Sequence, residues 1–194
     1  MINRCLMRIG AQPLQSESAP GAPQRLEVYE AVIERLGAHP WTFMKTTRRL
    51  ARLTDAPSPK FYKYAFQLPS DMPGAPRAVY DSETMRTPTT AYDIEGESRL
   101  LANAEAIWIS YSTLANPARW PGDFRELFAT ALMAEYALAI REDRPLHDRL
   151  YLKAFGTPSQ DGKGGMFATA LELDSQSVPS TVVGGGYNPL IDVR

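Results

Sequence analysis

The sequence predicts an α+β fold, in which a small helical bundle carries an inserted short antiparallel β-meander and ends in an extended C-terminal arm. Three observations support this prediction. Apolar residues recur at helical spacing near the N-terminus and again after Pro121. Between residues 41 and 112 they alternate at the spacing of a strand. Beyond the three glycines at 184–186, the last residues follow neither pattern.

The first two helices are predicted at residues 1–9 and 24–37. The first stops at Gly10. In the second, the apolar side chains fall on a single helical face: Leu26, Tyr29, Val32, Ile33 and Leu36. Gly37 supplies the left-handed residue that ends many helices, and Pro40 prevents continuation.

The segment 41–112 is predicted to be the strand-rich insertion. Trp41 and Phe43 follow the second helix at a spacing of two, which favours a strand directly after the helix. Residues 62–68 alternate between apolar and polar side chains, and Pro69 ends that strand. Further short strands are expected at 78–80, 91–94, 100–101 and 107–111. Turn-length spacing between them is typical of an antiparallel meander.

Two more helices are predicted at 122–141 and 145–155. Asp123 followed by Glu126 resembles a capping box, and Pro145 suits the first turn of a helix. The glycine-rich residues 156–165 are expected to form a flexible break before a short helical piece at 167–173. The sequence thus predicts a body at 1–155, followed at 156–194 by a hinge loop, the helical piece and the arm.

Composition and charge exclude several function classes. A formal net charge of −1 gives the whole molecule no attraction for nucleic acid or for a membrane surface. Cys5 is the sole cysteine, so it forms no intramolecular disulfide, and its place on the apolar face of the first helix predicts a small buried hydrophobe. No run reaches the roughly 18 apolar residues of a membrane span. We therefore expect a protein that folds in a reducing cytoplasm, away from membranes.

The motifs do not predict catalysis, a cofactor or a metal site. The glycines around Lys163 differ from a phosphate-binding loop, because the gap between them is five residues and Gly164 replaces the hydroxyl that binds magnesium. His39 is expected to cap the preceding helix end as a cation, and His147 lacks the second histidine of a helical zinc pair. We expect a protein that is not an enzyme. A small cytoplasmic hydrolase or transferase, with a site formed only in three dimensions, remains the alternative.

The densest basic cluster contains Lys45, Arg48, Arg49 and Arg52. It is interpreted as a solvated strand face, as a set of inter-subunit salt bridges, or as a strip that faces DNA in a channel. Channel contacts would reach phosphates and carry no sequence information. A DNA-binding regulator that uses the same strip is a further alternative, and a steep salt dependence of its DNA affinity would distinguish it.

The C-terminal arm combines a hinge at Gly184, Gly185 and Gly186 with an apolar, aromatic end. A disordered tail is usually polar and charged. This segment is therefore expected either to fold back on its own body or to dock on a partner by strand addition or groove binding. The residues beyond the hinge are Tyr187, Asn188, Pro189, Leu190, Ile191, Asp192, Val193 and Arg194.

Several motifs occur in an order and at spacings that together are typical of one family. They are Asn3-Arg4-Cys5-Leu6-Met7-Arg8-Ile9-Gly10 with Pro13-Leu14, Pro40-Trp41-Thr42-Phe43 with Thr47-Arg48-Arg49, the run YKYAFQLP at 62–69, and Trp120-Pro121. Across nearly its full length the chain resembles the head-to-tail adaptor (connector) proteins of tailed bacteriophages, the tail tubular protein A group, and the adaptors of gene-transfer agents. It departs from them at 156–165, where related chains usually continue an uninterrupted helix.

The resemblance implies a structural virion protein at the head-to-tail junction, present in the host cytoplasm during assembly. It implies a dodecameric ring that joins the portal protein to a tail tube, nozzle or tail-terminator protein. Packaged DNA would pass through the lumen during ejection without sequence-specific binding. The resemblance also implies that residues 187–194 bind the portal. Trp41 and Phe43 are expected, from their place at the junction of helix and strand, to form a structural anchor.

Overall fold

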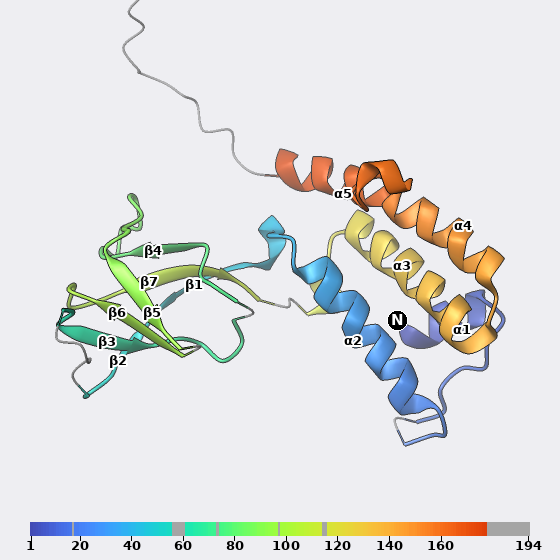
Figure 1. The fold of residues 1–194 in the computed structure, drawn as a ribbon, viewed down its shortest axis with the longest axis horizontal. Coiled ribbons are helices and arrows are strands. Elements are labelled where there is room, and N and C mark those ends of the chain that lie inside the picture. Colours follow the sequence, from blue (N-terminus) through green and yellow to red (C-terminus); the bar gives the residue numbers. More distant parts are fainter. Residues whose placement is uncertain (17, 56–60, 73, 97, 114–115, 178–194) are drawn as a thin grey trace, which may run out of the picture.

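The computed structural model describes residues 1–16, 18–55, 61–72, 74–96, 98–113 and 116–177. These residues form an α+β fold, which confirms the predicted class. A helical lobe (residues 1–44 and 113–177) and a β lobe (residues 45–112) lie side by side (Figure 1). The β lobe is inserted in the chain between the second and third helices.

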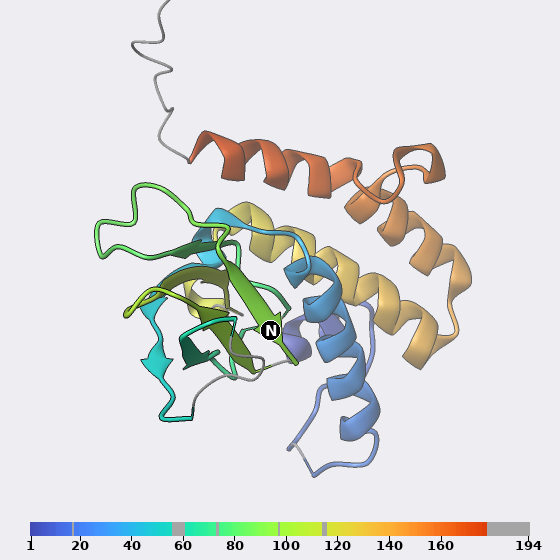
Figure 2. The same cartoon turned by 60° about the vertical axis from the view of Figure 1, so that its left-hand side comes forward.

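The helical lobe contains α1 (Ile2–Arg8), α2 (Ala22–Gly37), α3 (Gly122–Arg141), α4 (Arg144–Phe155) and α5 (Gly165–Gln176). Short 3-10 turns are η1 (Thr42–Met44), η2 (Pro117–Arg119) and η3 (Pro158–Gln160). Helix α3 is central, because each of the other helices packs against it. Figure 2 shows α5 lying along α3.

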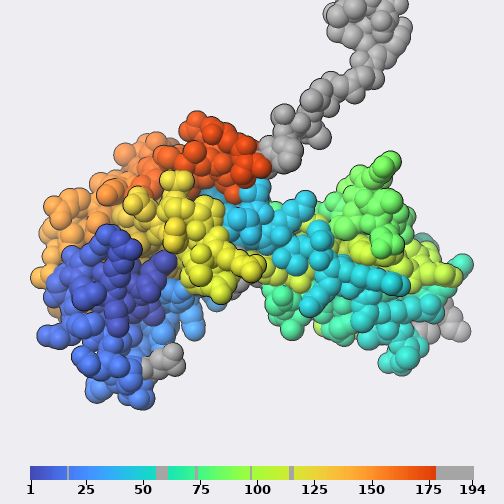
Figure 3. All heavy atoms as spheres, turned by 180° about the vertical axis from the view of Figure 1, so that it is seen from behind, coloured from blue at the N-terminus to red at the C-terminus, as the bar shows by residue number. Residues whose placement is uncertain are grey.

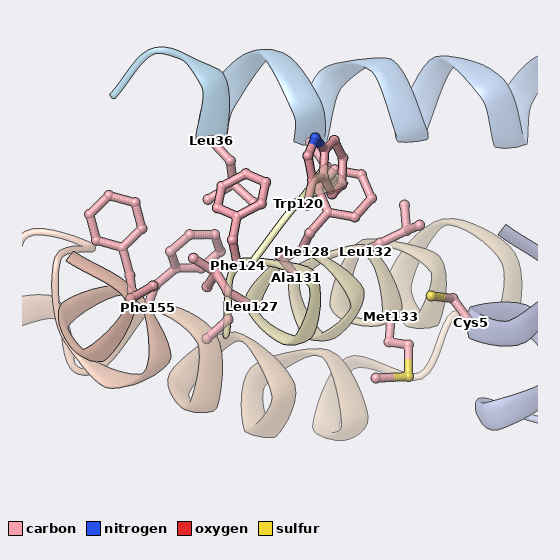
Figure 4. Close-up of a cluster of buried hydrophobic side chains, with 14 of the residues drawn as sticks. Cys5, Leu36, Trp120, Phe124, Leu127, Phe128, Ala131, Leu132, Met133 and Phe155 are labelled. Carbon is pink, nitrogen blue, oxygen red and sulfur yellow. The ribbon is translucent and has the colours of Figure 1, made fainter. Parts of the chain in front are cut away.

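One hydrophobic core holds the helical lobe together. Helix α3 supplies its centre with Phe124, Leu127 and Phe128, all of them at most 1% exposed. Figure 4 shows side chains from α1, α2 and α4 converging on α3, among them Cys5, Leu36 and Phe155. Since α3 is apolar on nearly all sides, the other helices cover it rather than leaving one face in water.

The β lobe contains two antiparallel sheets. The strands are β1 (Lys45–Arg49), β2 (Ala51–Arg52), β3 (Tyr64–Gln67), β4 (Ala78–Tyr80), β5 (Tyr92–Glu95), β6 (Arg99–Ala102) and β7 (Trp108–Ser112). Their order is β1-β7-β4 in one sheet and β2-β3-β6-β5 in the other. The β lobe has a hydrophobic core of its own, distinct from that of the helical lobe, which includes Phe66, Leu100 and Ile109. Each lobe therefore has its own buried apolar centre.

The chain enters and leaves the β lobe through neighbouring strands. Strand β1 pairs with β7 in antiparallel register, with Lys45 opposite Ser112. One residue beyond each strand, the backbone N–H of Thr113 donates to the carbonyl of Met44 over 2.9 Å. The insertion therefore begins and ends at the same place on the helical lobe.

The structure corrects the predicted strand at Trp41 and Phe43. These residues belong to a turn, because Trp41 precedes η1 and the first strand begins only at Lys45. Both aromatic rings lie on the helical core, with ring centroids 6.1 Å apart. A spacing of two can thus arise from a tight turn as well as from a strand.

The structure also corrects the flexible break expected at 156–165. This segment is a compact turn, in which Thr157 N–H donates to Gln160 Oε1 over 2.9 Å and Gly164 N–H donates to the Phe155 carbonyl over 2.8 Å. The turn reverses the chain so that Phe167 and Ala170 of α5 enter the same core as α3 and α4. Helix α5 therefore belongs to the helical body, which does not end at residue 155.

Candidate functional site

The two lobes meet at a buried aromatic cluster around Trp41. The indole is fully buried, and its Nε1–H donates to the carbonyl of Leu36 over 2.7 Å. Its ring contacts Phe124 edge-on at 5.0 Å and Phe167 at 5.5 Å between centroids. Phe43 adds a further edge contact with Phe124 at 4.9 Å. Trp41 therefore fixes the end of α2 to α3 and α5 just before the chain enters the β lobe.

Polar contacts complete this region, which we call the lobe junction: Trp41, Thr42, Phe43, Arg77, Ser112 and Asp174. Arg77, just before β4, donates through Nη2 to the Trp41 carbonyl and through Nε to Ser112 Oγ, each over 2.8 Å. Asp174 of α5 accepts from the backbone N–H of Thr42 over 2.9 Å. Burial lowers the pKa of Arg77, and the negative charge of Asp174 opposes that shift. The junction thus ties α5, the entry turn and strand β7 together.

The predicted basic cluster lies on the edge strands β1 and β2. Lys45, Arg48, Arg49 and Arg52 are all exposed. Strand geometry divides them, because successive side chains of β1 point to opposite faces. Arg48, paired opposite the buried Ile109, lies on the core face and reaches Asp71 at 3.8 Å.

The remaining arginines of the cluster lie against aromatic rings. On the outer face of β1, the guanidinium of Arg49 lies 5.4 Å from the ring centroid of Trp108. On β2, the guanidinium of Arg52 lies 3.9 Å from the ring of Tyr64. The cluster is therefore divided between two faces and two sheets rather than forming a single-faced strip.

Asp71 also lies beside a tyrosine, because Tyr111 donates its hydroxyl to this carboxylate at 3.3 Å. Burial raises the pKa of Tyr111, and the negative charge of Asp71 raises it further. This pairing keeps the Tyr111 hydroxyl protonated as a donor beside Arg48. It is a structural contact at the sheet edge.

A groove of about 660 Å³ lies on the helical lobe between α1, the start of α3 and the end of α4. Its floor is apolar and includes Cys5, Met133 and Met166. Its charged lining residues are Arg4, Arg8, Arg125, Lys153 and Glu126. Four basic side chains and one carboxylate therefore line the groove among the described residues. Within that part of the chain none of the five has an ion-pair partner within 4.0 Å.

The titratable side chains considered for catalysis lie in separate places. His39 packs edge-on against Trp41 and Phe167, and burial lowers its pKa. His147 lies on α4 with its Nδ1 at 2.9 Å from Asp148. Burial raises the pKa of the Cys5 thiol, which donates to the carbonyl of Ala129 over 3.8 Å. Among the described residues, no three potential metal ligands gather in one place.

The predicted portal-binding residues, Tyr187–Arg194, and the hinge Gly184–Gly186 lie outside the described residues. In the part of the chain that the structure describes, no helix is both long enough and apolar enough to cross a membrane.

Sequence reasoning missed the groove and the polar part of the lobe junction. Arg4 and Arg8 stand four residues apart, which places them on one side of α1, so part of the groove had a local signal. No local sequence pattern indicated Arg77 or Asp174, because these residues contact the entry turn only through the tertiary fold. Comparison with models of known protein families and with curated proteins finds no match for this chain.

Proposed function

We propose that this chain is a structural head-to-tail adaptor of a tailed phage, which joins the portal to the tail as one subunit of a ring. The observation that carries the proposal is the two-lobed build with a fixed junction. An adaptor must present one surface to each of two partners at a constant separation. Two lobes with separate cores, joined at Trp41, Arg77 and Asp174, are suited to that task.

The proposed division of roles follows the lobes. The helical lobe supplies the contacts between subunits, and the β lobe faces the tail component, which is a tube, nozzle or terminator protein. Residues 187–194, after the glycine hinge, bind the portal. The basic residues Lys45, Arg48, Arg49 and Arg52 lie at subunit contacts or toward the DNA in the lumen. The mature protein is located in the virion, at the head-to-tail junction.

The proposal is tested by mixing the full-length chain, and a chain that ends at Ser180, with the portal protein of the same virion. Size analysis and electron microscopy of each mixture measure ring formation and portal binding. We expect only the full-length chain to join the portal in a ring-sized species. Equal binding by both chains would remove the role assigned to residues 187–194. Absence of binding by either chain would overturn the adaptor proposal.

Affinity for DNA distinguishes the alternative of a regulator. A conduit releases its DNA, so we expect weak binding to duplex DNA with a shallow dependence on salt. A steep loss of affinity with salt, removed by Arg49→Glu and Arg52→Glu, would instead favour a DNA-binding regulator.

A further inference from the structure

The groove on the helical lobe is matched by an acidic surface elsewhere on the same lobe. Glu27, Glu30 and Glu34 of α2 are all exposed. At about 100° per residue they fall within roughly 60° of one another around the helix. Val32 and Leu36, which are buried, lie on the opposite side of α2. We call these three glutamates the acidic stripe.

The acidic stripe has no internal partner to neutralise it. Within the described residues, none of its carboxylates lies within 4.0 Å of a cation. The nearby Arg35 is directed elsewhere, because it donates to the Tyr151 hydroxyl and lies 4.0 Å from the Phe155 ring. Three like charges on one helix face repel one another, so an external cation would stabilise them.

The groove and the stripe lie on different sides of the helical lobe. Phe128 of α3 faces α2, where it contacts Tyr29 at 5.2 Å between ring centroids. Ala129 and Met133 of α3 line the groove. These two sets of α3 positions point in different directions around the helix. Helix α2 accordingly lies on the near side of Figure 1, whereas α1 lies on the near side in the reverse view of Figure 3.

An exposed apolar side chain in the groove favours a protein occupant. Met1, which lines the groove, is 43% exposed. Apolar side chains that line an open groove are typical of protein contact sites. The methionine floor and the basic rim together suit a partner surface with aliphatic stems that end in carboxylates. The glutamates of the acidic stripe have that chemistry.

We propose that the acidic stripe of one copy of this chain docks in the basic groove of the next copy. Because the two surfaces are different and lie on different sides, the contact is head-to-tail, and repetition closes into a ring when the rotation allows. This inference rests on the proposed ring and names its subunit interface. It assigns Arg4, Arg8, Arg125 and Lys153 to binding of Glu27, Glu30 and Glu34.

Charge reversal on each side tests the pairing. One variant, Arg4→Glu with Arg8→Glu, gives the groove the charge of the stripe. A second variant, Glu30→Lys with Glu34→Lys, gives the stripe the charge of the groove. The control, Lys63→Glu with Arg86→Glu, changes net charge as much as the first variant does, but at positions on the β lobe. Circular dichroism and thermal unfolding establish that every variant is folded.

Assembly is measured by sedimentation velocity and native mass spectrometry, with and without the portal protein. We expect the unaltered chain and the control to assemble alike, and each reversed variant alone to associate at least about tenfold more weakly. An equal mixture of the two reversed variants should restore association between them, through the unaltered groove of one chain and the unaltered stripe of the other. A chain that carries all four substitutions should assemble alone.

Three other outcomes would overturn the inference, and they differ in what they leave standing. If each reversed variant alone forms rings like the unaltered chain, subunits meet through other surfaces while the adaptor proposal stands. If the unaltered chain stays monomeric even with the portal, the interface and the ring both fail. A groove that instead holds nucleic-acid phosphates would lose DNA affinity in the first variant with no change in assembly, which also overturns the inference.

Discussion

His39 illustrates how a single side chain takes its role from tertiary packing. Its place at the end of α2 predicted a cationic cap, but the ring packs against Trp41 and Phe167. Burial lowers the pKa of His39, and Arg77 and Lys163 lower it further, while Asp174 opposes them. The neutral imidazole is therefore the form that fits the fold, and the expected cationic cap is wrong.

The lowered pKa of His39 gives a testable pH dependence. The unfolded chain takes up a proton near the ordinary histidine pKa of about 6.5, before the folded chain does. The contribution of His39 to the free energy of unfolding is therefore fully present above about pH 6.5 and is lost as the pH falls below that value. We expect His39→Gln to weaken the decrease in urea midpoint between about pH 7.5 and about pH 5.5. His147→Gln is the control, and a stronger decrease in the His39 variant would contradict the assignment.

Two serines of β7, Ser110 and Ser112, allow a hydroxyl with a hydrogen bond to be compared with a hydroxyl that has none among the described residues. Ser110 is 1% exposed, and its hydroxyl has no hydrogen-bond partner among the described residues. A buried hydroxyl without a partner is destabilising, so Ser110→Ala should leave the free energy of unfolding unchanged or raise it by up to about 1 kcal/mol. Ser112 accepts from Arg77, so Ser112→Ala should lower it by about 1.5 kcal/mol. Urea unfolding measures both, and a larger loss for the Ser110 variant would contradict the roles assigned to the two hydroxyls.

At the scale of elements, the turn between α4 and α5 depends on Gly156. This residue has φ 78° and ψ −165°, a region that is almost restricted to glycine. A Cβ added there would lie 2.7 Å from Gly164 Cα, a backbone atom that cannot move aside cheaply. The turn that returns α5 to the helical core is thus built on the absence of a side chain.

We therefore expect Gly156→Ala to lower the free energy of unfolding by at least about 2 kcal/mol, through backbone strain and overpacking together. Gly21→Ala is the matched control, because Gly21 also has a positive φ of 77° but open space around its Cβ position. It should cost about 1 kcal/mol. Denaturant unfolding of both variants provides the comparison. Equal losses would show that the close approach at Gly164 does not matter.

The elements that sequence reasoning located best are those that depend on local spacing. Helix α3 was predicted at 122–141 and occupies Gly122–Arg141, and strand β4 was predicted at 78–80 and occupies Ala78–Tyr80. The capping box at Asp123 and Glu126 is wrong, because the N-cap of α3 is Pro121, two residues before Asp123, and no side chain caps the helix. Capping depends on which residue leaves the helical conformation, and spacing alone does not determine that.

The sheet order and the candidate sites were less accessible from the sequence. The pairing of β1 with β7 joins the two ends of the insertion, and short connections alone favour pairing between successive strands. The basic residues of β1 and β2 were found, but their division between faces followed only from the register. The groove combines residues from α1, α3, α4 and α5, so its shape depends on helix packing that no local pattern encodes.

At the scale of the whole molecule, the two cores predict two units of local stability. Phe66 is 1% exposed in the core of the β lobe, and Leu127 is fully buried in that of the helical lobe. We expect Phe66→Ala, at a cost of about 3–5 kcal/mol, to accelerate hydrogen exchange in β3, β6 and β7 while α3 stays protected. Leu127→Ala should have the converse effect. Uniform acceleration in both lobes would show that the junction couples them into one cooperative unit.

The adjacency of the ends of the β lobe also has a consequence for the history of the gene. Met44 and Thr113 are joined by a backbone hydrogen bond across the base of the insertion. A recombination event that removed the intervening codons would need only a tight reverse turn to reconnect α2 and α3. Exchange of that segment for another would change the β lobe and leave the core of the helical lobe in place. A gene can in this way acquire a new β lobe without a new helical frame.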